Sequence, residues 1–149
     1  MKHLICSALL LTTISAPAVG QAAQAGASAV PVTAEYYYRI RWGSHNEFKQ
    51  LYERNHAPIM REMQRQGFVT KLEVEEPYTH LAGGPRWDLR VTVTYRDAAS
   101  AMFAGGFEKA FAEAAARLYP DKAKFDADEA RRFSLLEDHW DIIVMPAAP

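Results

Sequence analysis

The residues of this sequence best suited to chemistry are two tyrosines and one histidine: Tyr52, His56 and Tyr78. An imidazole with an ordinary pKa near ~6.5 can take a proton from a phenol or from an activated carbon acid. Tyr52 lies one helical turn before His56, whereas Tyr78 follows much later in a loop. We therefore predict that His56 is the catalytic proton-transfer residue and that Tyr52 and Tyr78 orient the substrate.

Each of these residues also has a structural interpretation. Pro58 cannot donate a backbone hydrogen bond, so His56 could instead bond to the carbonyls that this proline leaves free. Tyr52 could be an ordinary core residue. Tyr78 and His80 share a long loop, and both could simply be solvated.

The predicted substrate-binding residues are Trp42, His80 and Trp87. The two tryptophans lie on strand faces that we expect helices to cover, where they form either part of the core or the apolar wall of a pocket. His80 would contribute a hydrogen bond if its loop folded over the mouth of that pocket. The expected ligand is a small apolar or aromatic molecule.

The sequence gives little support for metal or cofactor chemistry. Its single cysteine, Cys6, lies in a segment expected to be removed on export, which excludes disulfides, thiolate metal sites and cysteine nucleophiles. His45 and His56 lie about 16 Å apart along one helix, too far to share an ion. A phosphate-loop motif is also missing. We predict no metal and no cofactor.

Charge argues against two classes of partner. The chain carries 17 Lys and Arg against 18 Asp and Glu, a formal net charge of −1, and its longest basic block is Arg131-Arg132. Nucleic acids and anionic membrane surfaces select strongly basic proteins. We therefore expect no nucleic-acid partner and no membrane partner.

Residues 1–25 are typical of a secretory signal. A short basic start and an apolar run from Leu4 to Ile14, too short to span a membrane, precede a small-x-small cleavage motif. We predict a periplasmic or secreted protein. Residues 26–34 are small and apolar with one proline, which predicts a flexible lead-in, so the folded domain is expected to span 35–146.

Hydrophobic periodicity defines the elements that must position these residues. A period of two predicts four strands, at 36–42, 68–76, 87–95 and 139–145. Helical spacing follows the capping residues Ser44, Asp97 and Asp126, with interruptions expected near Ala57 and at Gly105-Gly106. In the last strand we expect Trp140 in the core and His139 at the rim.

This order of elements is the βαββαβ pattern of a ferredoxin-like α+β domain. It predicts a four-stranded antiparallel sheet with its main helices on one face. The other face would carry Arg39, Arg41 and Arg90 among acidic residues and would be left open. Pairing with a second copy is the simplest way to cover it, so we predict a homodimer.

The stretch Phe48-x3-Tyr52-x3-His56-Ala57-Pro58 resembles the EthD and NIPSNAP-like families of the dimeric α/β-barrel superfamily. Members include cofactor-free oxygenases, lactone isomerases, polyketide cyclases and proteins of no known activity. The resemblance implies a dimer with two facing sheets and a small-molecule pocket between each sheet and its helices. It suggests a cofactor-independent enzyme acting on a small aromatic or polyketide-like compound. The alternative is a non-catalytic periplasmic ligand-binding or structural dimer.

Overall fold

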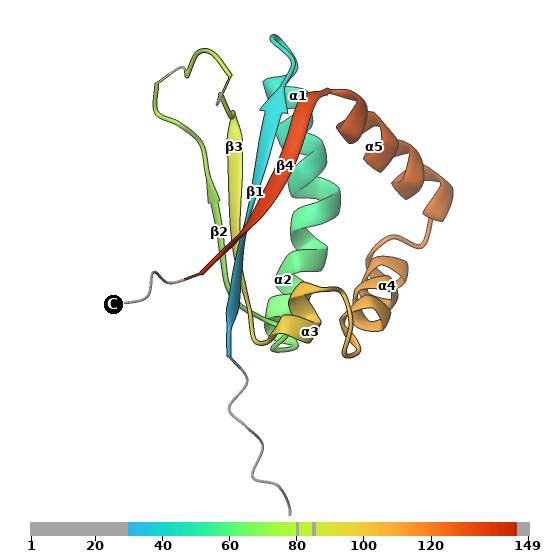
Figure 1. The fold of residues 1–149 in the computed structure, drawn as a ribbon. Coiled ribbons are helices and arrows are strands. Elements are labelled where there is room, and N and C mark those ends of the chain that lie inside the picture. The colour runs from blue at the N-terminus through green and yellow to red at the C-terminus, as the bar shows by residue number, and fades with distance from the viewer. Residues whose placement is uncertain (1–29, 80, 85, 146–149) are drawn as a thin grey trace, which may run out of the picture.

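The computed structural model describes residues 30–79, 81–84 and 86–145, so the predicted signal segment and His80 lie outside the described residues. The elements in chain order are β1 (Val32–Ile40), α1 (His45–Leu51), the π-helix η1 (Tyr52–His56), α2 (Ala57–Arg65), β2 (Val69–Glu75), β3 (Leu89–Tyr95), α3 (Ala98–Ala101), α4 (Phe107–Leu118), α5 (Lys122–Ser134) and β4 (Leu136–Val144). The strands pair antiparallel in the order β2-β3-β1-β4, and the helices cover one face (Figure 1). The predicted α+β ferredoxin-like architecture is confirmed.

The folded domain begins earlier than the sequence predicts. β1 starts at Val32, inside the expected lead-in, because Val32 and Thr33 pair with Tyr95 and Thr94 of β3. Backbone pairing of this kind extends the strand beyond the clear alternation that begins at Tyr36. Within the described residues, no helix is long and apolar enough to cross a membrane.

The hydrophobic core lies between the sheet and the helices. Alternate residues of β1 and β3 point inward and are buried, as the period of two predicts. Helices α1, α2 and α4 supply the opposing side chains. The largest buried aromatic and aliphatic residues are Tyr52, Tyr95, Phe48, Phe107, Ile40, Ile59, Met63 and Leu89. An aliphatic or phenylalanine side chain of this kind contributes roughly 1.5–3 kcal/mol by leaving water.

The interruption expected near Ala57 takes the form of a π-helical turn. In η1 the N–H of Ala57 donates to the carbonyl of Tyr52, one residue further back than in an α-helix, just before Pro58. The helix therefore continues through the proline with a widened turn instead of breaking. Such turns are frequent at functional sites. Here the turn buries Tyr52 and Asn55 and brings His56 to face the sheet.

The second helical region also differs from expectation in detail. Gly105 and Gly106 have φ of 60° and 91°, left-handed values that separate α3 from α4 as predicted. Helix α5 begins at Lys122, earlier than the expected cap at Asp126, because the Asp121 side chain accepts from the Lys124 N–H at 2.9 Å. The longer α5 lies beside α1 and η1 and closes this side of the core (Figure 1).

Candidate functional site

A cavity of about 140 Å³ lies between the sheet and the helices, and we call it the inner cavity. Its lining is mostly aromatic and includes two histidines and one arginine. The lining residues are Tyr36, Tyr38, His56, Met60, Val91, Val93, Tyr95, Phe103, Phe111, Arg132, Phe133 and His139. Phe103 and Phe133 are 47% and 50% exposed, so the cavity opens to the surface beside these two rings.

His56 enters this cavity from the π-helical turn. Its pKa falls from an ordinary 6.5 to about 4, chiefly because burial penalises the imidazolium, and the charge of Arg132 acts in the same direction. The ring lies near Tyr52 and Phe111, with centroid distances of 5.5 and 6.3 Å. In the part of the chain that the structure describes, His56 makes no hydrogen bond to a carbonyl, so nothing there supports its bracing role at Pro58. At neutral pH the ring is an uncharged base.

Tyr52 is buried behind His56 and does not line the cavity. Only 1% of the residue is exposed, and its hydroxyl has no hydrogen-bond partner among the described residues. Burial raises the pKa of Tyr52, which keeps the phenol neutral. The ring packs edge-on against Tyr38 at 6.3 Å. This environment is that of the core residue considered as the alternative, and the predicted orienting role of Tyr52 stays a prediction.

Two tyrosines on neighbouring strands give the cavity a second polar feature. The hydroxyls of Tyr36 and Tyr95 are 2.8 Å apart and hydrogen-bonded to each other. Burial is the main cause of the raised pKa of each phenol. The pair therefore offers neutral hydroxyls to a ligand.

Arg132 is the polar residue of this site that sequence reasoning missed. It lies near the end of α5 and is 1% exposed. Its Nε and Nη2 donate to Glu129 at 3.1 and 2.6 Å, while Nη1 is buried without a partner among the described residues. The guanidinium lies 4.5 Å from the Phe133 ring. The only sequence signal was a Glu three residues earlier, a spacing common on solvated helices.

In the final strand, β4, the ring-bearing residues His139 and Trp140 face the opposite sides of the sheet from those expected. His139 pairs with Tyr38 and Trp140 with Tyr37, so His139 faces the cavity and Trp140 the open face of the sheet. The prediction of Trp140 in the core was wrong because its open-face partner, Tyr37, stacks on it at 5.3 Å. His139 Nδ1 lies 2.9 Å from the Tyr37 carbonyl, to which it must donate. In the neutral ring Nε2 is then an acceptor.

Tyr78 and Trp42 lie apart from the inner cavity. Both line a separate hollow of about 320 Å³, which we call the outer hollow, with Glu76, Asp88 and other residues that follow β1 and β2. Tyr78 is fully exposed, and Trp42 is 66% exposed, because the residue lies beyond the end of β1 at Ile40. Helices do not cover Trp42 as expected. The structure therefore does not bring Tyr78 together with His56.

Trp87 also differs from expectation. It lies on the open sheet face, where its ring meets Tyr37 edge-on at 6.1 Å and the Arg90 guanidinium at 5.4 Å. Trp87 precedes β3, which begins at Leu89, so the alternation of the strand does not extend to it. The ring is not part of the inner cavity.

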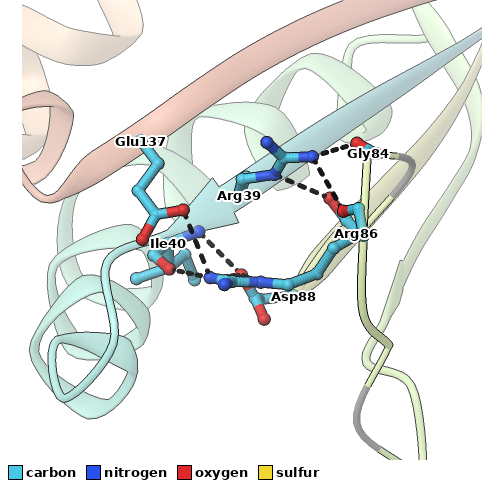
Figure 2. Close-up of polar contacts among 7 residues, drawn as sticks. Arg39, Ile40, Gly84, Arg86, Asp88 and Glu137 are labelled. Carbon is cyan, nitrogen blue, oxygen red and sulfur yellow. Dashed lines mark hydrogen bonds and ion pairs between the residues drawn. The ribbon is translucent and has the colours of Figure 1, made fainter.

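A polar cluster beside the outer hollow holds the β2–β3 loop in place (Figure 2). Asp88 accepts from the Ile40 N–H at 2.8 Å and from the buried Arg86 at 3.0 Å. Arg86 also donates to the Ile40 carbonyl and faces Glu137 at 3.7 Å, while Arg39 donates to the Arg86 carbonyl at 3.2 Å. Both guanidinium groups of this cluster donate to protein acceptors through their Nε and Nη2 atoms. The role of the cluster is structural.

Comparison with known proteins finds similarity in fold. No protein-family model and no curated protein sequence matches it. A Pseudomonas aeruginosa protein of known structure has a TM-score of 0.51, with 12% identity over 83% of this chain and 100% of the other. The chain has a ferredoxin-like fold.

Other solved structures similar to this chain include a NIPSNAP family protein from Agrobacterium tumefaciens. It has 19% identity over 80% of this chain and 88% of the other, with a TM-score of 0.45. Another is SnoaB, a cofactor-independent oxygenase from Streptomyces nogalater, with 14% identity over 81% of this chain and 97% of the other and a TM-score of 0.43. The sequence resemblance to NIPSNAP-like proteins is thus accompanied by a similarity to solved structures that concerns the fold alone.

Proposed function

We propose that this protein binds a small aromatic molecule in the inner cavity and that His56 takes a proton from it. The observation that carries the proposal is an uncharged imidazole in an aromatic cavity, with no protein hydrogen bond among the described residues. A base held in this state is free to accept a proton from a bound ligand. Tyr36 and Tyr95 stand on the sheet side of the same cavity, and whichever hydroxyl accepts in their mutual hydrogen bond can donate its own proton to a ligand oxygen.

The size of the cavity narrows the class of ligand. Its 140 Å³ is close to the ~150 Å³ of an engineered apolar cavity that takes up benzene. One six-membered ring therefore fits, whereas a multi-ring polyketide does not fit without movement of the walls. Phe103 and Phe133 at the opening are the side chains that would move to admit a ligand.

The low pKa of His56 favours a reaction in which the proton is returned. An imidazolium with a pKa of about 4 is a stronger acid than an ordinary one, so it gives the proton back readily, and the neutral ring is a correspondingly weaker base that needs an activated substrate. Proton removal at one atom and return at another is an isomerisation. Such a reaction needs no oxidant, and its substrate would be a carbon acid or phenol activated by a neighbouring carbonyl.

A non-catalytic ligand-binding protein is the second candidate. A catalytic histidine is usually oriented by a third group such as a carboxylate. Among the described residues, no hydrogen bond orients His56, and Tyr52 and Tyr78 do not join it in the cavity. This observation favours binding without chemistry.

Self-association and export belong to the same proposal. Tyr37, Trp87 and Trp140 form an aromatic cluster on the open sheet face, beside the Arg90–Glu75 ion pair of 2.6 Å. An aromatic patch with polar neighbours is typical of a protein interface. We propose that two copies pair through this face and that the mature protein is periplasmic or secreted.

The binding proposal is tested by filling the cavity. Val93 lines it, so Val93→Phe should abolish retention of single-ring aromatic compounds in native mass spectrometry. Val74→Phe is the matched control, since Val74 is 40% exposed on the edge strand and does not line the cavity. Equal retention by both variants would refute the cavity as the site.

Proton transfer is tested separately with a retained ligand that contains an acidic C–H. In D2O the wild-type protein should exchange this hydrogen, as observed by NMR. His56→Gln should bind the ligand but exchange it roughly 10²–10⁴-fold more slowly. A wild-type protein that binds without exchanging any ligand hydrogen supports the non-catalytic candidate.

A further inference from the structure

The inner cavity contains a cationic group that the proposed proton transfer does not use. Arg132 lines the cavity, and both donors of its Nη1 are without a partner among the described residues. The other two nitrogens are occupied by Glu129. A guanidinium has five N–H donors in a fixed plane, so these two cannot rotate toward the protein acceptors that the others use.

Leaving such donors buried and unpaired is unfavourable. The loss of hydration is compensated only when an acceptor replaces the water. Besides Glu129, the guanidinium faces the rings of Phe133 and Phe48, at 4.5 and 5.8 Å, which stabilise positive charge but accept no strong hydrogen bond. The Tyr38 phenol also interacts with this guanidinium, yet Nη1 keeps no hydrogen-bond partner among the described residues. A missing acceptor in a cavity lining points to a ligand group.

The charge around the cavity indicates that this acceptor is an anion. Among the described residues, Arg132 is the one cationic side chain of the lining, which contains no Asp or Glu, and the His56 ring beside it is uncharged at neutral pH. Glu129 does not fully offset the guanidinium, because 20% of its side chain is exposed to water while only 2% of that of Arg132 is. Hydrogen bonds from a guanidinium to a carboxylate are about twice as strong as those between neutral groups.

We infer that the ligand of the inner cavity is a small aromatic carboxylate, with a carboxylate oxygen that accepts hydrogen bonds from Nη1 of Arg132. This inference rests on the proposed function, since it adds a charge requirement to the same site. The ring occupies the aromatic part of the cavity, and the carboxylate lies toward α5. His56 is then left to act on another atom of the ligand.

The test uses single-ring probes that differ only in charge. Isothermal titration of the full chain should show that benzoate binds at least tenfold more tightly than benzamide or toluene. In a charge-removing double variant, Arg132→Met with Glu129→Gln, this preference should disappear. Arg131→Gln is the matched control, because Arg131 is an exposed neighbour paired with Glu47 and should leave the preference intact.

The outcomes separate this inference from the proposed function. If benzamide and toluene bind as tightly as benzoate, the site binds aromatic rings without regard to charge. Water then accepts the hydrogen bonds of Arg132 Nη1, and the anion inference is wrong. If none of the three probes binds, the inner cavity is not an aromatic site, and both proposals fail. The wild-type comparison alone decides the matter if the Arg132 variant does not fold.

Discussion

Lowering the pH should destabilise this protein, because the folded state disfavours a protonated His56. The substitution His56→Gln should remove this part of the pH dependence of stability. In the unfolded chain His56 has a pKa near 6.5, and in the folded protein about 4. Between these two pH values the unfolded state therefore binds more protons than the folded state. The contribution of His56 to the free energy of unfolding is complete above pH 6.5 and falls toward pH 4. At about 1.4 kcal/mol per pH unit, the loss reaches about 3 kcal/mol at pH 4.

The assay compares urea unfolding of the wild-type protein and His56→Gln at several pH values from 7 to 4. Carboxylates also titrate in this range, but they are common to both proteins and cancel in the difference. The groups that face His56, namely Arg132, Glu129 and His139, are likewise unchanged. The stability of His56→Gln relative to wild type should rise by about 3 kcal/mol on acidification. A difference that stays constant from pH 7 to pH 4 would refute a desolvated, neutral His56.

Other predictions concern the sheet face, the N-terminus and the polar cluster of Figure 2. Arg90→Glu should dissociate a wild-type dimer in analytical ultracentrifugation at tens of micromolar, whereas Arg61→Glu on the exposed side of α2 should not; a monomeric wild type contradicts the pairing. Intact-mass measurement of exported protein should place its first residue at Gly26, and a longer mature chain would exclude this cleavage site. Asp88→Ala should lower the free energy of unfolding by roughly 3 kcal/mol, since Arg86 loses its 3.0 Å partner; a loss below about 1 kcal/mol in urea unfolding contradicts this role.

The fold was predictable because its signals are local. The alternation of β3 and the helical spacing in α1 and α2 appear directly in the sequence, and Asp97 caps α3 as expected, accepting from the Ser100 N–H at 2.7 Å. Ser44 is the N-cap of α1 but makes no side-chain capping bond. The start of β1 at Val32 could not be predicted, since it depends on pairing with a strand far along the chain.

The candidate site was predictable only where a residue lies inside a regular element. His56 lies in a continuous helix with a strong apolar stripe, and the structure places it in the cavity, as the helical spacing suggests. Trp42 and Trp87 lie just outside strands, where the period of two no longer determines the face. Arg132 had only the weak signal of Glu129 three residues before it, because its burial results from how α5 packs on the rest of the domain.

Helix α5 connects these observations. It contributes one fully buried side chain, Arg132, and one partly buried ring, Phe125, which stacks on Tyr119 at 4.8 Å. Its other contacts include exposed ion pairs, such as the bidentate Arg131–Glu47 pair at 2.7 and 2.9 Å. Exposed ion pairs each contribute little, about 0–1 kcal/mol, so α5 is held less firmly than the sheet it covers. One side of the inner cavity is thus formed by the firmly held sheet with Tyr36 and Tyr95. The other side includes Arg132 of the less firmly held α5. A ligand anion bound to Arg132 would add a buried contact to this helix, so ligand binding should raise the free energy of unfolding of the domain.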